Sequence, residues 1–130
     1  MIDFQNATYV KLKKVGNDIG QSMIGVMLLP DEVIVSTYKG IRDQVIFTNK
    51  RIIAVNVQGL TGAKKDFTSL PYSKIQAYSV ETAGTAEKLF SFTADCELEL
   101  YFSSIGKVKF EFSGATDILE IGKVISEYVL

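Results

Sequence analysis

Two stretches in the second half of the chain alternate between apolar and polar residues. From Cys96 to Phe102, and again from Val108 to Phe112, every second side chain is apolar, which is the pattern of a strand with one buried face. The connection Ser104-Ile105-Gly106 has the odd length that places both apolar sets on one face, with Gly106 where a positive φ is needed. We therefore predict a β-hairpin here.

Five further strands are predicted before this hairpin. They are runs rich in β-branched and aromatic residues, separated by turn-forming residues such as Gly40, Asn49, Gly59 and Pro71. The predicted strands are Val33–Lys39, Gln44–Thr48, Arg51–Val57, Asp66–Leu70 and Ile75–Glu81. The interval from Ala83 to Asp95 is predicted as a loop. We expect its Phe90 and Phe92 to fold back onto the core.

Helical spacing occurs at both ends of the chain. After Gly114 the apolar residues recur with a period of 3.6, which predicts a helix. Thr116 or Asp117 can cap this helix, and Glu120 is at the position that would complete a capping box with Asp117. At the other end, a helix is predicted from a cap at Asp3 to Gly16, and a second, turn-rich helical stretch from Asp18 to the stop at Pro30. The apolar sets are Phe4, Ala7, Leu12 and Val15 for the first helix, and Ile118, Ile121, Val124, Ile125 and Tyr128 for the last.

Seven strands followed by one amphipathic helix predict a mainly β fold. Closing the strands into a partly open antiparallel barrel, with the helix capping one end, would remove most unpaired strand edges and bury the apolar stripe of the helix. This architecture is that of the pleckstrin-homology superfold. We predict residues 1–29 as an N-terminal helical extension and residues 30–130 as the pleckstrin-homology-like domain.

Several short motifs in fixed order resemble a family of bacterial pleckstrin-homology-like domains. The resemblance covers roughly residues 28 to 130, and it implies a seven-stranded barrel with a C-terminal helix and, often, self-assembly. Two features differ from eukaryotic phosphoinositide binders: the first hairpin has only Lys39 and Arg42 as cations, beside Asp43, and the chain has no Trp. These differences argue against phosphoinositide binding. The motifs are FTNKRII (Phe47–Ile53), QGLTGAKK (Gln58–Lys65), PYSKI (Pro71–Ile75), SVETAG (Ser79–Gly84) and the terminal SEYVL.

Composition narrows the classes of function. The chain of 130 residues has a net charge of −1, one cysteine and no histidine. A near-neutral charge argues against nucleic-acid binding, and the lack of histidine removes Ser-His-Asp and Cys-His catalysis and most transition-metal sites. We expect no cofactor, no metal and no enzymatic activity. A single cysteine and the absence of a secretory signal or of an apolar run of about 20 residues predict a cytoplasmic protein.

Two groups of residues are candidate binding sites. In a seven-stranded meander the loops after the first, third and sixth strands open at one end, so their cations could surround a barrel rim and hold a phosphate or an anionic lipid headgroup; alternatively they form a solvated rim. The N-terminal apolar residues either pack on the barrel or form a contact between copies. The rim cations are Lys39, Arg42, Lys64, Lys65 and Lys107, and the N-terminal set is Phe4, Tyr9, Leu12, Met23 and Met27.

The leading hypothesis is a non-enzymatic module that assembles with itself and presents the rim or an exposed strand edge to another protein. Binding would use strand addition or an apolar groove between barrel and helix. The alternative is peripheral binding of anionic lipid headgroups or phosphate by the rim cations. Cys96 lies on the apolar phase of its strand, so we expect a buried structural thiol there.

Overall fold

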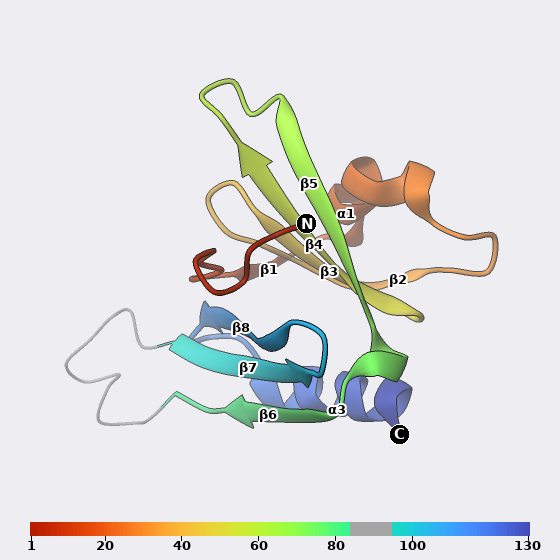
Figure 1. The fold of residues 1–130 in the computed structure, drawn as a ribbon, viewed down its shortest axis with the longest axis vertical. Coiled ribbons are helices and arrows are strands. Elements are labelled where there is room, and N and C mark those ends of the chain that lie inside the picture. Colours follow the sequence, from red (N-terminus) through yellow and green to blue (C-terminus); the bar gives the residue numbers. More distant parts are fainter. Residues whose placement is uncertain (84–94) are drawn as a thin grey trace.

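The chain folds into two antiparallel β-sheets packed face to face (Figure 1). The computed structural model describes residues 1–83 and 95–130, so the predicted positions of Phe90 and Phe92 lie outside the described residues. The five-stranded sheet has the order β1 (Lys13–Val15), β2 (Ile34–Lys39), β3 (Gln44–Thr48), β4 (Arg51–Gln58) and β5 (Lys64–Pro71). The three-stranded sheet has the order β6 (Ala77–Glu81), β7 (Asp95–Phe102) and β8 (Gly106–Ser113).

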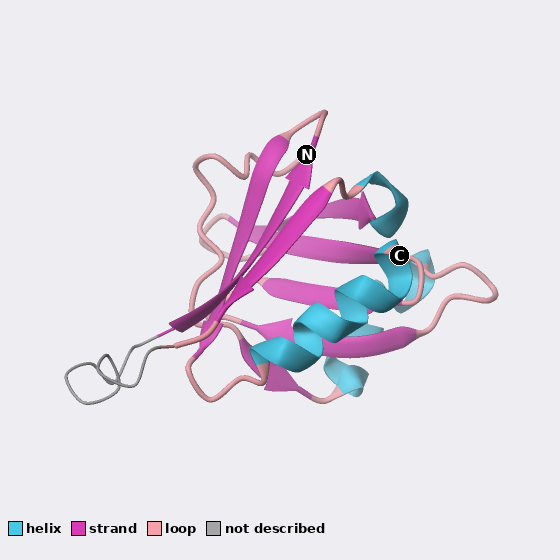
Figure 2. Ribbon diagram, turned by 90° about the horizontal axis from the view of Figure 1, so that it is seen from below, coloured by secondary structure: helices cyan, strands magenta, loops and turns pink. Residues whose placement is uncertain are grey.

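Helical segments cover the sheets on different sides (Figure 2). Helix α1 (Asn17–Ile24) and the 3₁₀ turn η1 (Gly25–Met27) pack on the outer face of the five-stranded sheet, and the 3₁₀ turn η2 (Tyr72–Lys74) connects the two sheets. Helix α3 (Ile118–Val129) packs against β6, β7 and η2. The side chain of Asp117 accepts a hydrogen bond from the Glu120 N–H (3.2 Å), which confirms the predicted cap of this helix.

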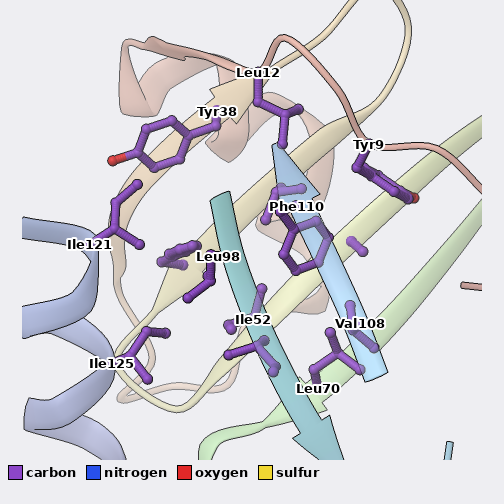
Figure 3. Packing of buried hydrophobic residues seen from close by; sticks show 14 of the residues in the cluster. Tyr9, Leu12, Tyr38, Ile52, Leu70, Leu98, Val108, Phe110, Ile121 and Ile125 are labelled. Atoms are coloured by element: carbon purple, nitrogen blue, oxygen red, sulfur yellow. The ribbon is translucent and has the colours of Figure 1, made fainter. Parts of the chain in front are cut away.

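The main core lies between the two sheets and α3. Its side chains come from the inner faces of both sheets, and α3 adds Ile121 and Ile125, which point toward Leu98 (Figure 3). The predicted phases of β7 and β8 are confirmed, because Leu98, Phe110 and the other apolar residues of the alternation are buried. Gly106 has φ = 76°, as the predicted turn requires.

Residues 9–12, here called the N-terminal clasp, join the two sheets along one side. Leu12 donates its N–H to the Glu111 carbonyl (3.1 Å) and accepts from the Ser113 N–H (2.9 Å), while the Tyr9 carbonyl accepts from the Glu111 N–H (2.8 Å). The chain then enters β1, which pairs with β2. On the other side β5 and β6 are not paired with each other, so the sheets do not close into a barrel.

The helix predicted from Asp3 to Gly16 is wrong. A short turn follows Asp3, Lys11 has φ = 54°, and residues 13–15 form β1. The Tyr9 carbonyl and both backbone groups of Leu12 are bonded to β8, so they do not make the hydrogen bonds of a helix. The second predicted helix exists as α1, but its N-cap is Gly16 rather than Asp18. With β1 the described chain has eight strands, one more than predicted.

A buried ion pair anchors the segment after η1 to the five-stranded sheet. Arg51 donates from Nε and Nη2 to the two carboxylate oxygens of Glu32 (both 2.9 Å). Glu32 also accepts from the Thr48 hydroxyl (2.7 Å) and the Leu29 N–H (3.1 Å). Burial alone would raise the pKa of Glu32, but these hydrogen bonds and the charge of Arg51 outweigh it and lower the pKa from 4.5 to about 2.

Candidate binding surface at the hairpin tips

The turns of the β2–β3 and β4–β5 hairpins lie on the same side of the five-stranded sheet, and the β4–β5 hairpin extends beyond the β2–β3 turn (Figure 1). Arg42, in the first turn, donates a hydrogen bond from Nη2 to the carbonyl of Gly59 in the second. The second turn closes through the Gly62 N–H and the Gly59 carbonyl (3.3 Å), and both glycines have positive φ, 79° for Gly59 and 69° for Gly62. The Arg42–Gly59 hydrogen bond thus links the two turns.

Four of the five predicted rim cations belong to these two hairpins. Lys39, Lys64 and Lys65 are exposed at the ends of their strands, and Arg42 lies in the first turn. Within residues 1–83 and 95–130, no salt bridge joins any of the four to a carboxylate. The four positive charges are therefore not neutralised by direct ion pairs.

The two aspartates of this region already have partners. The carboxylate of Asp43 accepts the Val57 N–H (2.9 Å). The Asp66 carboxylate lies 2.9 Å from the amine of Met1 and accepts a hydrogen bond from the Thr68 hydroxyl (2.7 Å). Both interactions lower the pKa of Asp66, and the one with the Met1 amine has the larger effect. Both carboxylates thus serve the local structure, although their charges remain near the cations.

Sequence reasoning missed a further cation, Lys13. Strand β1 places Lys13 directly opposite Lys39 of β2, and like charges in such a cross-strand pair are destabilising. The missed strand explains the omission, because residues 3–16 were predicted to be helical. Two lysines held side by side raise the local density of positive charge next to Arg42.

Lys107 does not join the other rim cations. It lies on β8 of the other sheet, with its Nζ 3.9 Å from a Glu99 oxygen. It lines a hollow of about 330 Å³ with Phe4 and Tyr9, whereas Arg42 lines a different hollow of about 270 Å³. Residues 8–10 line both hollows and thus separate them. The structure therefore places four of the five predicted cations in the two hairpins and the fifth in the other sheet.

The tips also carry two apolar residues that sequence reasoning did not select. Ile41 in the β2–β3 turn and Leu60 in the β4–β5 turn are 99% and 107% exposed. Turn positions favour Gly, Pro, Asn, Asp and Ser, so an aliphatic residue in each tight turn was the signal available in the sequence.

The apolar residues predicted for self-association lie mostly inside the fold. Tyr9 and Leu12 are buried in the main core, and Phe4 packs against it with its ring centroid 6.3 Å from that of Phe110. Burial raises the pKa of Tyr9, whose hydroxyl has no hydrogen-bond partner among the described residues. Met23 and Met27 pack against a second, smaller hydrophobic cluster on the α1 side of the five-stranded sheet, formed by Ile24, Ile46, Ile53 and Val55. The sequence left open whether these residues pack on the sheets or form a contact between copies. Tyr9 and Leu12 pack inside the fold, between the two sheets.

Strand β5 leaves a backbone edge open. Val57 donates its N–H to Asp43, on the β3 side, so Val57 and its β5 partner Lys65 form a non-hydrogen-bonded pair. By alternation, Lys65, Phe67 and Ser69 direct their backbone groups away from β4. Pro71, next in this series, has no N–H to expose. The polar contacts of Met1 and Ile2 with β5 go to the side chains of Asp66 and Thr68. Among the described residues, no backbone hydrogen bond from outside the sheet reaches this edge.

Other chemistry has little support in the described residues. No cluster of three or more His, Cys, Asp or Glu residues there could hold a metal ion. Cys96 is buried, and its Sγ lies 3.5 Å from the Ser113 carbonyl. In the same part of the chain, no helix has the length and apolar composition needed to cross a bilayer.

Comparison with known proteins agrees with the fold described above. The family model described as "Bacterial PH domain" matches residues 3–129. The chain therefore belongs to the bacterial pleckstrin-homology domain family, which confirms the resemblance seen in the sequence. It is 37% identical over 108 residues to YjqA of Bacillus subtilis, a protein described as uncharacterised, with 82% of each chain covered.

Two solved structures have the same fold. One is a DUF1696 family protein with a pleckstrin-homology domain from Shewanella loihica (34% identity, TM-score 0.78, covering 93% of this chain and 99% of that one). The other is a pleckstrin-homology domain from Shewanella amazonensis (34% identity, TM-score 0.66, covering 96% and 93%). These names give a fold and no enzymatic activity.

Proposed function

We propose that the protein is a non-enzymatic interaction module that assembles with itself through the open edge of β5. The observation that carries this proposal is an eight-residue edge strand with outward-facing backbone groups at Lys65, Phe67 and Ser69. Such an edge is a template for another strand, and natural proteins usually cover it or interrupt it. Here Lys65 and Pro71 limit its ends, while Phe67 in its middle is 37% exposed.

A second copy of β5 fits this edge by symmetry. In an antiparallel pairing centred on Phe67, Lys65 of one copy lies opposite Ser69 of the other, so no like charges meet. The two Phe67 residues then form the central cross-strand pair, and aromatic pairs of this kind are favourable. This isologous arrangement is the type expected of a two-fold dimer.

The test is the particle mass of two variants at position 67. Phe67→Pro removes the outward N–H without removing a hydrogen bond to β4, whereas Phe67→Thr keeps that N–H and a strand-forming residue. We expect the unmodified chain and Phe67→Thr to be dimeric or larger in light scattering, and Phe67→Pro to be monomeric with an unchanged circular dichroism spectrum. A monomeric unmodified chain would contradict self-assembly, and assembly of folded Phe67→Pro would exclude the β5 edge.

A second candidate function is binding of anionic lipid headgroups or phosphate at the hairpin tips. The specific observation is that these cations all lie toward one end of the five-stranded sheet, on β1, β2, the β2–β3 turn and β5, and make no salt bridge within the described residues. They are Lys13, Lys39, Arg42, Lys64 and Lys65. Each such cation contributes about 1 kcal/mol near an anionic membrane, and salt screens the attraction.

Vesicle flotation tests this candidate. We expect salt-sensitive binding to phosphatidylglycerol-containing vesicles and none to neutral phosphatidylcholine vesicles. Lys64→Glu/Lys65→Glu should abolish the binding, while the same charge reversal at the exposed Lys74 and Lys123, on η2 and α3, should leave it unchanged. Equal effects of the two double variants would show that net charge alone, and not the tip surface, governs the interaction.

A further inference from the structure

Ile41 and Leu60 occupy corresponding places at the tips of neighbouring hairpins. Each sits within a tight turn, after Gly40 and Gly59 respectively, and each is fully exposed. The Gly40 N–H donates to the Asp43 carbonyl (2.9 Å), and the Gly62 N–H donates to the Gly59 carbonyl, so a backbone hydrogen bond closes each turn without the side chain of Ile41 or Leu60. Neither side chain belongs to either hydrophobic cluster. They contribute no core packing that would explain why an aliphatic residue stands at each tip.

We propose that Ile41 and Leu60 insert together into the interfacial layer of an anionic bilayer, while the surrounding cations bind lipid headgroups. This inference rests on the second candidate function above. It adds a second binding term, burial of apolar side chains, to the electrostatic one. A peripheral protein that combines the two attractions binds more durably than one that uses either alone.

The two tips can act together because the structure holds them together. The hydrogen bond from Arg42 to Gly59 crosses directly between the turns. A Cβ built on Gly62 would lie 3.5 Å from Arg42 Nη2, which places that guanidinium against the second turn as well. Asp43 adds another link through the Val57 N–H. The residue that follows Ile41 thus contacts the residue that precedes Leu60.

The arrangement of charge selects a bilayer as the occupant. Cations lie behind both apolar tips: Lys39 and Arg42 beside Ile41, and Lys64 and Lys65 four and five residues after Leu60. This order of apolar tip and cationic flank matches the order of acyl region and phosphate layer in an anionic membrane. A free phosphate ion would use the cations and gain nothing from the aliphatic side chains.

Tryptophan reporters test insertion directly because the chain has no Trp. In separate single variants, Ile41→Trp and Leu60→Trp place the fluorophore at the tips, and Val26→Trp places it at a fully exposed position on η1. With phosphatidylglycerol vesicles we expect a blue-shifted emission, and quenching by brominated lipid, for the two tip variants only. Inorganic phosphate should cause neither change.

A paired binding measurement separates this inference from the candidate function on which it rests. Ile41→Ser/Leu60→Ser keeps every cation, and its affinity for the same vesicles should fall about tenfold or more, given the apolar area withdrawn from water. Unchanged affinity of this variant, or bound tip variants without a blue shift, would overturn insertion and leave purely electrostatic binding. If the unmodified chain binds no vesicles, both ideas are overturned.

Discussion

Replacing Glu32 with glutamine should remove a pH-dependent contribution to stability. Glu32 is 5% exposed and accepts hydrogen bonds from Arg51, Thr48 and Leu29. A carboxyl group whose pKa is 4.5 in the unfolded chain and about 2 in the folded chain stabilises the fold by about 3 kcal/mol, at about 1.4 kcal/mol per pH unit. Because the folded pKa is the lower one, this contribution is complete above pH 4.5 and is lost as the pH falls toward 2.

The assay is urea unfolding of the unmodified chain and of Glu32→Gln across this pH range. We expect the variant to be about 3 kcal/mol less stable at neutral pH and the gap to close toward pH 2. Asp31→Asn is the control, because Asp31 is exposed and its ion pair with Lys50 (3.1 Å) lies at the surface, where such pairs contribute little. A gap that stays constant with pH would refute the reasoning.

Removing the other partner gives an independent check on the same ion pair. Arg51→Met leaves the carboxylate of Glu32 buried without its cation, which should cost about 3 to 5 kcal/mol. Combining it with Glu32→Leu removes the buried charge too and should restore much of that loss. If the double variant is as unstable as Arg51→Met, the loss comes from the contacts of Arg51 with Ser69 and Met27 instead.

Three smaller predictions concern single contacts. Gly106→Ala should lower the free energy of unfolding by about 1 to 2 kcal/mol, because its φ of 76° is strained for a residue with a Cβ; Ser103→Ala in the same turn should not. Tyr72→Phe should lower it by about 1 kcal/mol through loss of the bond to the Thr48 carbonyl (2.7 Å), and an unchanged melting temperature would contradict this. Cys96 should react with a thiol reagent only on unfolding, since it is buried; rapid labelling of the folded chain would disagree.

Elements with a strong local pattern could be predicted from the sequence. The β7–β8 hairpin and its glycine turn depend on alternation and loop length, and the C-terminal helix on a period of 3.6, so neighbouring residues carry the information. The N-terminal region was different. Its apolar residues fit a helical period, but their backbone partners are about 100 residues away in β8. No local pattern encodes such pairing.

The candidate site was predicted in part for the same reason. Hairpin connectivity placed Lys39, Arg42, Lys64 and Lys65 toward one end of the five-stranded sheet, since each belongs to a hairpin visible in the sequence. Lys107 was grouped with them by assuming one continuous seven-stranded meander, whereas it lies on β8 of a separate three-stranded sheet. Lys13 was missed because it depends on β1, a strand of three residues. A topology predicted from the visible strands alone could not give the position of Lys107 or of Lys13.

The N-terminal clasp imposes an order on folding. Tyr9 and Leu12 find their backbone partners in Glu111 and Ser113, so these early residues can dock only after β8 has left the ribosome. Until then Tyr9 and Leu12, both buried in the native fold, remain exposed to solvent. Contacts that close so long a loop form late and slow the overall reaction. We expect the nascent chain to present its aromatic N-terminal segment to chaperones until β8 has been synthesised, and the clasp to dock only after that point.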